Sequence, residues 1–248
     1  MTDETSAVIT GASRGIGLSI AKALAKKKMA LTITARGAEA LDALVPELMA
    51  LGSPRVIAVA ADMTDPEAAT TITEAHKHHH GGALTVLVLN AGVGTAGRIE
   101  SYPTARIDKT MAVNFRSPLL LMQSAIPLLH EGASRRPGLG AKVLVVSSIT
   151  GVFAEAGLAV YGASKAALLS LVNTFNAEES ASGITATAIA PAYVDTDMSA
   201  WKHDSIPPET MIPADDIAQL VAALVNMSAR SVVAPVVISR AGASGYGA

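Results

Sequence analysis

The chain has 248 residues, of which 50% are hydrophobic and 3% aromatic, and its formal net charge is −2. A charge so close to zero provides neither a basic surface for nucleic acid nor an attraction to anionic membranes, so we expect neither partner. The chain contains no cysteine, which excludes disulfides, thiolate metal sites and cysteine nucleophiles, and its length is that of one large domain, residues 1–248.

Apolar segments typical of strands alternate along the whole chain with segments of helical periodicity. The predicted strands cover residues 5–10, 29–34, 55–60, 84–89, 142–147, 184–190 and 232–238. The predicted helices cover residues 16–28, 38–50, 66–79, 103–130, 158–181 and 214–228. Parallel strands need such long crossover connections. We therefore predict an α/β fold of the doubly wound, Rossmann type, with a seven-stranded parallel sheet and helices on both faces.

The first predicted strand is followed by "TGASRGIG", in which Gly11, Gly15 and Gly17 stand where the first helix begins. Glycine permits a sharp turn and the close approach of another group to the backbone. The start of a helix also carries unpaired N–H groups and a partial positive charge, which favour an anion such as a pyrophosphate. The segment predicts a phosphate-binding turn; a tight turn without a ligand is the alternative.

The second strand ends at Ala35-Arg36, where folds that bind NAD usually place an acidic residue beside the adenosine ribose. An arginine at this point, together with Arg14 in the glycine turn, favours a 2′-phosphate, because guanidinium groups form paired hydrogen bonds with phosphate oxygens. These residues predict NADP(H) as the cofactor. The alternative is that both side chains are only solvated.

Small polar residues follow the next three strands. Asp62 follows the third strand, and its carboxylate is suited to accept a hydrogen bond from an adenine amino group. Residues 90–92, Asn-Ala-Gly, follow the fourth strand, where the backbone can pass close to a ribose, and Ser148 follows the fifth. Each is also typical of a turn or a cap. Ligands of open parallel sheets bind at the carboxyl ends of the strands, so their shared edge indicates a binding site.

The helix predicted at 158–181 contains "YGASK", in which Tyr161 and Lys165 are four residues apart and share one helix face. A free tyrosine titrates near about 10. A nearby ammonium group favours the phenolate, so Lys165 is expected to lower the pKa of Tyr161. The hydroxyl of Ser148 can hold a substrate carbonyl oxygen beside the phenol. Together these groups predict a proton-transfer site.

These motifs are similar to those of the short-chain dehydrogenase/reductase family. The resemblance extends from Thr10 to about Met227 and rests on the glycine turn, "NAG" at 90–92, Asn114 in "VNF", Ser148, "YGASK" and "PAYVDTDM" at 191–198. It implies an oxidoreductase that transfers a hydride between a nicotinamide cofactor and a carbonyl carbon.

The resemblance also implies roles for individual residues. Tyr161 would protonate the carbonyl oxygen as general acid, and Lys165 would lower its pKa and contact the nicotinamide ribose. Ser148 would orient the substrate, and Asn114 would bend its helix and hold a water that links Lys165 to solvent. The residues implied to bind the dinucleotide are Gly11, Ser13, Arg14, Gly15, Ile16, Gly17, Arg36, Asp62, Asn90, Ala91, Gly92, Tyr161, Lys165, Pro191, Val194 and Thr196. Asp62 would meet the adenine.

Three features depart from the family pattern. Ala192 replaces the glycine that usually follows the proline after the sixth strand, and Arg116 stands where a small glycine is common. The C-terminal segment 239–248, SRAGASGYGA, replaces the usual pair of glycines. These differences concern substrate and subunit contacts more than the chemistry.

Two segments interrupt the alternation of strands and helices. Residues 131–142 are predicted to be a surface loop, and the proline-rich residues 191–213 a substrate lid on the ligand-binding edge. Within the latter, Tyr193, Met198 and Trp201 can cover an apolar substrate, although simple packing is an equal alternative.

Other polar clusters carry no function in this interpretation. The run "HKHHH" at 76–80 is predicted to be a solvated helix end, because consecutive histidines cannot all face one metal ion. Glu178 and Glu179 lie late in a helix and are expected to face water. No metal is expected.

We predict an NADPH-dependent carbonyl reductase, equally a secondary alcohol dehydrogenase, for a small or medium apolar ketone. By analogy with the family it would form a homodimer or homotetramer through the two long helices, and the absence of a targeting or membrane segment predicts a cytoplasmic protein. The alternatives are a 3-oxoacyl-thioester reductase acting on acyl carrier protein substrates and a non-catalytic NADP(H)-sensing protein.

Overall fold

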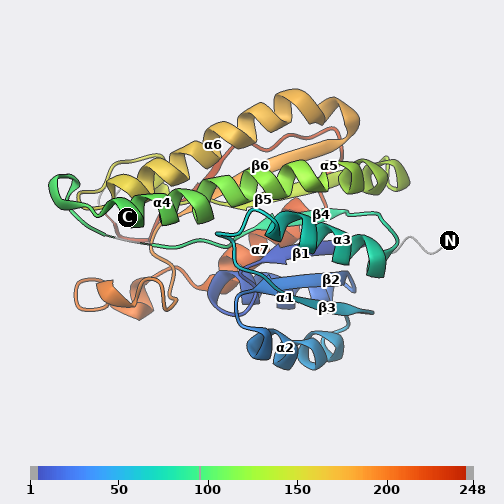
Figure 1. Ribbon diagram of the computed structural model, residues 1–248, viewed down its shortest axis with the longest axis horizontal. Helices are drawn as coiled ribbons and strands as arrows, with labels where there is room; N and C mark the ends of the chain where they lie inside the picture. The colour runs from blue at the N-terminus through green and yellow to red at the C-terminus, as the bar shows by residue number, and fades with distance from the viewer. Residues whose placement is uncertain (1–4, 95, 244–248) are drawn as a thin grey trace.

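The structure is a computed structural model that describes residues 5–94 and 96–243. Seven parallel strands form one sheet in the order β3-β2-β1-β4-β5-β6-β7 (Figure 1). The strands are β1 (Ser6–Thr10), β2 (Ala30–Ala35), β3 (Val56–Ala60), β4 (Val86–Leu89), β5 (Ala141–Val146), β6 (Ile184–Pro191) and β7 (Val236–Ile238). The α-helices are α1 (Gly15–Lys26), α2 (Ala38–Ala50), α3 (Ala68–His80), α4 (Thr104–Met111), α5 (Ser117–Arg135), α6 (Ala159–Glu179) and α7 (Ala214–Leu224). The predicted doubly wound parallel sheet is confirmed.

Helices cover both faces of the sheet, because side chains along a strand alternate between the two faces. In β1, Ala7 and Ile9 belong to a buried cluster with residues of α1, α2 and α7. Val8, between them, belongs to a second cluster with residues of α3, α5 and α6. Burial on both faces explains why the central strands are continuous apolar runs. Figure 1 shows α2 beside β3 at one side of the sheet and α6 at the other.

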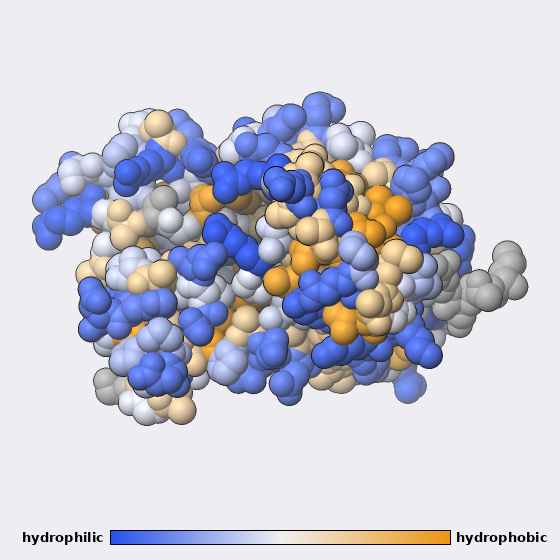
Figure 2. All heavy atoms as spheres, turned by 90° about the horizontal axis from the view of Figure 1, so that it is seen from below, coloured by the Kyte–Doolittle hydropathy of each residue, from blue (hydrophilic) through white to orange (hydrophobic). Residues whose placement is uncertain are grey.

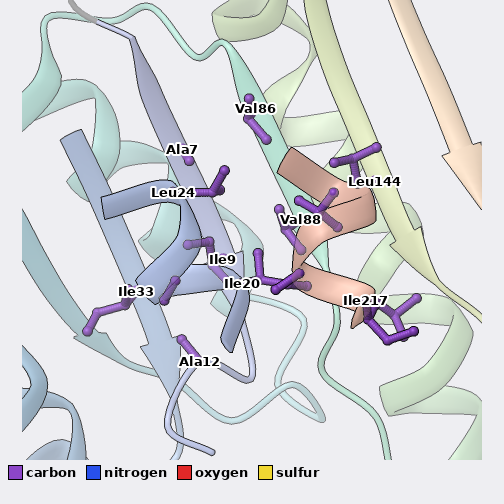
Figure 3. Packing of buried hydrophobic residues seen from close by; sticks show 14 of the residues in the cluster. Ala7, Ile9, Ala12, Ile20, Leu24, Ile33, Val86, Val88, Leu144 and Ile217 are labelled. Carbon is purple, nitrogen blue, oxygen red and sulfur yellow. The ribbon is translucent and has the colours of Figure 1, made fainter. Parts of the chain in front are cut away.

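The first of these clusters is drawn in Figure 3. Ile20 and Leu24 of α1 and Ile217 of α7 lie over the strand residues Ile9 and Val88. All five side chains are completely buried. Each such aliphatic side chain contributes about 1.5–3 kcal/mol when it leaves water. The core is therefore built from branched aliphatic residues, as the 3% aromatic content requires.

The helix predicted at 103–130 consists of two helices in the structure. α4 ends at Met111, a π-helical turn covers Ala112–Arg116, and α5 begins at Ser117. Pro118 has no N–H group and cannot donate to the carbonyl of Asn114, four residues earlier, as an α-helix requires. The predicted helix is therefore interrupted by a π-helical turn at Asn114, the residue that the family resemblance implied would bend it. π-helical turns of this kind are frequent at functional sites.

The predicted surface loop at 131–142 is also wrong in its extent, because α5 continues to Arg135 and β5 begins at Ala141. The helix passes through Gly132, where a Cβ would collide with the carbonyl oxygen of Leu84. Close packing against the segment before β4 thus outweighs the low helix propensity of glycine.

The last predicted strand, 232–238, is shorter than expected, because β7 covers only Val236–Ile238. Pro235 has no N–H group for a ladder, and Val232 is 50% exposed. The other predicted strands and helices are confirmed, with boundaries that differ by up to four residues. Of the C-terminal segment 239–248, residues 244–248 lie outside the described part of the chain.

The strand order determines where a ligand can bind. β1 pairs with both β2 and β4, so the chain turns from one half of the sheet to the other at this point. Open parallel sheets bind ligands beyond the carboxyl ends of the strands at such a switch point. None of the described helices is both long and apolar enough to cross a membrane.

Candidate active site

A cleft of about 630 Å³ lies at the carboxyl ends of β1 to β6. Seen from below, the molecule is hollowed between its main body and the lobes at the left of the view (Figure 2). The sequence-predicted site residues that line the cleft are Gly11, Ser13, Arg14, Gly15, Ile16, Arg36, Asp62, Asn90, Ala91, Gly92, Ser148, Tyr161, Lys165, Pro191, Val194 and Thr196. Gly17 and Asn114 are not part of the lining and act on it through their neighbours.

The glycine turn between β1 and α1 requires glycine for different reasons at different positions. Gly11 and Gly15 have positive φ angles of 65° and 53°, which other residues rarely adopt. A Cβ at Gly17 would collide with the carbonyl oxygen of Gly11, so Gly17 allows the turn to pack on itself. Gly15 begins α1 and faces Thr196. The N-cap residue Arg14 forms no side-chain cap, so the first N–H groups of α1 can receive an anion.

Thr10 and Asn90 hold the glycine turn against the end of β4. The Thr10 hydroxyl oxygen accepts hydrogen bonds from the backbone N–H groups of Asn90 and Ala91, both at 2.9 Å. The side-chain amide of Asn90 donates to the carbonyl oxygens of Thr10 and Gly11 at 3.0 and 3.1 Å. The Asn90 side chain therefore fixes the shape of the turn, while its neighbour Ala91 lines the cleft.

Three cationic side chains line the part of the cleft near β2 and β3. Arg36 follows β2, and Lys109, which the sequence analysis missed, comes from α4. Arg14 Nη1 forms an ion pair with Asp197 Oδ2 at 2.9 Å, and both side chains are largely exposed. Asp197 belongs to the segment that follows β6, so this ion pair joins the glycine turn to that segment. The region is suited to hold a phosphate monoester.

Asp62, after β3, is held by its own loop. Its Oδ1 accepts hydrogen bonds from the backbone N–H and the hydroxyl of Thr64, at 2.8 and 2.9 Å. These bonds hold the pKa of Asp62 below its usual value, with smaller contributions from Arg36 and Lys109. Arg116 donates to the Thr64 carbonyl oxygen at 2.7 Å, so the residue that departs from the family pattern steadies this loop. The second oxygen of Asp62 can accept a further hydrogen bond.

Ser148 and Tyr161 face the same part of the cleft from β5 and α6. Ser148 caps the short 3₁₀ turn η3 (Ile149–Gly151), and its Oγ accepts hydrogen bonds from Thr150 N and Oγ1 at 3.2 and 2.9 Å. Burial raises the pKa of the Tyr161 phenol, and a hydrogen bond with Ser148 acts in the opposite direction. The prediction that Lys165 lowers the pKa of Tyr161 is therefore wrong for the net shift, because burial removes the water that would stabilise the phenolate. At neutral pH the phenol keeps its proton and can donate it.

Lys165 lies beside Tyr161 as the helical spacing predicts, with Nζ 5.7 Å from the centre of the tyrosine ring. Nζ donates to the carbonyl oxygen of Val146 at 2.9 Å. Burial lowers the pKa of Lys165 to about 8. A Cβ at Gly92 would lie 3.4 Å from Nζ, so the glycine of "NAG" leaves room for the ammonium group. Lys165 is charged at neutral pH and favours negative charge on the neighbouring phenol oxygen.

Asn114 lies in the π-helical turn and is fully buried. Its side-chain amide donates to the Val93 carbonyl oxygen and to Ser164 Oγ, both at 3.0 Å, and its Oδ1 accepts from Val93 N at 2.8 Å. Ser164 in turn donates to the carbonyl oxygen of Tyr161 at 2.7 Å. Asn114 therefore connects the loop after β4 to the helix that carries Tyr161 and Lys165. Sequence analysis missed Ser164.

The backbone after β6 forms the opposite wall of the cleft. Val194 pairs with Ile212 in an isolated parallel bridge. The Ser199 hydroxyl donates to the carbonyl oxygens of Val194 and Thr196. Ala192 is buried, does not have a positive φ angle, and donates its N–H to the Ile238 carbonyl oxygen at 2.8 Å. Alanine in place of the usual glycine is therefore accommodated without backbone strain.

The predicted solvated helix end at 76–80 is wrong for His76 and His80, which are buried. His76 Nε2 lies 3.2 Å from the carbonyl oxygen of Ala83, which can only accept, so Nε2 carries the proton. Nδ1 then accepts from the Thr32 hydroxyl at 2.9 Å. The apolar face of α3 thus contains a hydrogen-bonded histidine. Within the ranges 5–94 and 96–243, no group of three or more His, Cys, Asp or Glu could hold a metal ion.

The expectation for the two late acids of α6 is half right. Glu178 is exposed. Glu179 pairs with His130 on α5, with 3.0 Å between Oε2 and Nε2, and its side chain is only 17% exposed. The prediction that Glu179 faces water is wrong because α5 lies beside the end of α6.

Similar proteins are found by sequence and by structure. Residues 5–206 match the family model described as short chain dehydrogenase. D-beta-hydroxybutyrate dehydrogenase of Rhizobium meliloti is 34% identical over 191 residues, which cover 77% of this chain and 71% of that protein. A short chain dehydrogenase of Burkholderia cenocepacia, solved in complex with NADP, has a TM-score of 0.83 and 33% identity, with 95% of this chain and 96% of that chain covered. A 3-oxoacyl-[acyl-carrier protein] reductase of Brucella melitensis, solved with NAD, has a TM-score of 0.85 and 25% identity, with 94% and 95% covered.

Proposed function

Because the chain belongs to the short-chain dehydrogenase/reductase family, and is thus an oxidoreductase that acts on CH–OH groups with a nicotinamide cofactor, we propose that it is an NADPH-dependent carbonyl reductase for apolar ketones. The observation that carries this proposal is the convergence of Ser148, Tyr161 and Lys165 on the cleft that the glycine turn also lines. The proton donor Tyr161, the cation Lys165 and the hydroxyl of Ser148 that would hold the substrate are then within one site.

The cleft fits a dinucleotide. The first turn of α1 and the glycine turn would hold the pyrophosphate, because no side chain caps the start of α1 and Gly15 has no side chain of its own. Asp62 would bind the adenine, and the backbone at Ala91 and Gly92 would pass the ribose. Lys165 would bind the nicotinamide ribose, and Val194 and Thr196 would contact the nicotinamide carboxamide and the phosphates. Ser13, Ile16 and Pro191 would complete the lining.

The protein's own part in the reaction is to orient the ketone and to give it a proton. When bound, the nicotinamide supplies the hydride. Ser148 Oγ would hold the carbonyl oxygen, and the Tyr161 hydroxyl, which is protonated at neutral pH, would transfer its proton to that oxygen. The Lys165 ammonium would stabilise the phenolate that remains. Asn114 would hold the water that returns a proton to this site, since Pro118 leaves its carbonyl without the donor of an α-helix.

NADPH is the proposed form of the cofactor. Support comes from Arg36, which stands at the end of β2 where an NAD-binding fold has an acidic residue, and from Arg14 and Lys109 in the same cleft lining, since guanidinium and ammonium groups favour a 2′-phosphate. The solved relative from Burkholderia cenocepacia is a complex with NADP, whereas that from Brucella melitensis is a complex with NAD. For this chain, Arg14, Arg36 and Lys109 in the cleft lining support NADPH.

The proposed substrate is apolar because of the apolar side chains that share the cleft with Tyr161. Leu158, Met198 and Trp201 are among the lining residues, and Met198 and Trp201 are about half exposed. We take residues 191–213 to be a lid over this region, within one domain of 248 residues. Exposed apolar side chains beside a catalytic group are suited to cover an apolar ligand.

The direct test is a panel of ketones mixed with protein and NADPH, in which oxidation of NADPH is followed by its absorbance. We expect turnover of small and medium apolar ketones, slower turnover with NADH, and the reverse reaction with secondary alcohols. Binding of NADPH without turnover of any panel member would contradict the proposal and support the alternative, a protein that senses NADP(H).

A second candidate is a 3-oxoacyl-thioester reductase, which the similarity to the Brucella melitensis enzyme favours. The panel therefore includes a 3-oxoacyl thioester. A kcat/KM for the thioester well above that for every simple ketone would replace the first proposal with this one.

We also propose that the chain forms a homodimer or homotetramer through α5 and α6. The support is that both helices are long and that Leu119 of α5 remains 39% exposed. Light scattering on the purified protein measures the mass directly, and a monomer at micromolar concentration would contradict this assembly.

A further inference from the structure

Four side chains form a cluster that contributes to the apolar wall of the cleft, and we call it the Glu155 clamp: Glu155, Tyr193, Trp201 and Lys202. Glu155 lies in the loop between η3 and α6, Tyr193 follows β6, and Trp201 and Lys202 lie in the 3₁₀ turn η5 (Ala200–Lys202). The clamp thus joins the loop before α6 to the segment that follows β6. Tyr193 and Trp201 line the cleft together with Tyr161, whereas Glu155 and Lys202 do not.

One carboxylate oxygen organises the clamp. Glu155 Oε1 accepts a hydrogen bond from the Tyr193 hydroxyl at 2.8 Å and one from Lys202 Nζ at 3.1 Å. The side chains of Glu155 and Lys202 are only 23% and 24% exposed, in contrast to the Arg14–Asp197 pair at 69% and 73%. An ion pair that is partly withdrawn from water is screened less than one on the surface.

The ammonium group of Lys202 also fixes the two aromatic rings. Nζ lies 5.3 Å from the centre of the Tyr193 ring and 4.7 Å from that of the Trp201 ring. The ring centres are 6.2 Å apart and the ring planes meet at 75°, an edge-to-face arrangement. Both distances from Nζ are within the range of cation–π attraction. The Lys202 ammonium group therefore holds both rings, and the Glu155 carboxylate holds the Tyr193 ring by the hydrogen bond to its hydroxyl.

The same geometry excludes one role for Lys202. Its ammonium group is bonded to Glu155, covered by two rings and absent from the cleft lining, so it does not present a charge to an anionic substrate. What the cleft receives from the clamp is a wall of two aromatic side chains in fixed orientation.

We propose that Glu155 and Lys202 are positioning residues that hold the Tyr193 and Trp201 rings so that the site selects ketones with a flat ring next to the carbonyl over open-chain ketones of similar size. This inference rests on the proposed function and specifies its substrate class. A rigid ring gains aromatic contact with the wall and loses little conformational freedom on binding, whereas an open chain must restrict several torsions.

The test uses Glu155→Gln, which keeps the shape and an acceptor for Tyr193, and Lys202→Met, which keeps the apolar stem. The substrates are an aryl methyl ketone and a straight-chain methyl ketone with the same number of carbon atoms. We expect the ratio of their kcat/KM values to fall about five- to tenfold in both variants, through a higher KM for the aryl ketone and with little change in kcat. Kd for NADPH is expected to stay unchanged.

Two control variants remove comparable ion pairs outside the cleft. Glu131→Gln breaks the pair with Arg135 on α5, and Lys22→Met breaks the pair of Lys22 with Glu47. Both are expected to leave the ratio unchanged. A ratio equal to that of the wild type in both clamp variants, or equal rises of KM for the two ketones, would overturn the inference.

A measurement without turnover separates this inference from the proposed function. Trp201 is the only tryptophan of the chain, so its fluorescence reports on the clamp alone. We expect the fluorescence anisotropy of Trp201 to fall in Lys202→Met and Glu155→Gln and to stay unchanged in the controls. Unchanged anisotropy in the clamp variants would overturn the inference even if ketones are reduced. An inactive wild type with the expected anisotropy changes would refute the carbonyl reductase and with it the ketone selectivity, and would leave only the positioning of Trp201 by Glu155 and Lys202 supported.

Discussion

The proton on Tyr161 is the residue-scale feature on which the proposed reaction depends. Burial raises the pKa of its phenol, so at neutral pH the group is an acid that can donate. Tyr161→Phe removes the hydroxyl and keeps the ring, and we expect kcat to fall by about a thousandfold or more, since general acid catalysis contributes roughly 10²–10⁴-fold. Kd for NADPH, measured by titration, should change little. Near-normal turnover in this variant would show that another group supplies the proton.

A second residue-scale prediction concerns the 2′-phosphate. In Arg14→Ala combined with Arg36→Ala, we expect Kd for NADPH to rise about tenfold to a hundredfold while Kd for NADH changes little, because only NADPH carries the lost contacts. Arg14→Ala alone should have the smaller effect, since Asp197 already engages this guanidinium. Arg106→Ala, an exposed arginine of α4, serves as control. Equal weakening of both dinucleotides would mean that neither arginine reads the phosphate.

At the scale of elements, α3 is joined to the sheet by a histidine that resists protonation. Burial, together with His80 4.8 Å away between ring centres, lowers the pKa of His76 from 6.5 to about 4. The folded state therefore binds fewer protons than the unfolded state between about pH 4 and 6.5. Stability that is present above this window is lost as the pH falls through it, by about 3 kcal/mol in total.

Urea unfolding at a series of pH values tests this prediction. In His76→Gln we expect a lower stability near neutral pH and a weaker loss between about pH 6.5 and 4 than in the wild type. The exposed His79, changed to Gln, should leave the pH dependence as it is. If the stability of His76→Gln declines as steeply with acid as that of the wild type, the histidine does not control the attachment of α3.

The elements also show how far sequence patterns reach. The strands and the long helices follow from periodicity, because a buried strand or an amphipathic helix repeats its apolar residues locally. The π-helical turn at Asn114 does not follow from periodicity, because the residues on both sides of it continue one apolar pattern, and only the family resemblance implied a bend there. Gly132 and His76 mislead for a related reason. A glycine is typical of a loop and a histidine of an exposed position, but Gly132 packs on Leu84 and His76 accepts a hydrogen bond from Thr32, both far away in the chain.

At the scale of the whole molecule, the parallel sheet gathers the ends of its strands at one edge, so residues named from separate motifs meet in one cleft. This rule is topological, and it explains why most candidate site residues could be found without a structure. Lys109, Glu155 and Lys202 could not be found in this way, because no motif marks them, and Ser164 lies in a motif that gave no sign of its contact with Asn114. Their positions depend on which helix or loop packs across the edge, and only the folded chain determines that.

The contact between Gly17 and the carbonyl of Gly11 has a thermodynamic consequence for the molecule as a receptor. Ordering the backbone of one residue costs about 1–2 kcal/mol. In the glycine turn this cost is offset during folding by the van der Waals contact between Gly17 and Gly11 and by the hydrogen bonds that the Asn90 side chain donates to Thr10 and Gly11. A dinucleotide therefore meets a preorganised surface, and its binding free energy is not reduced by the entropy of ordering the loop that receives it.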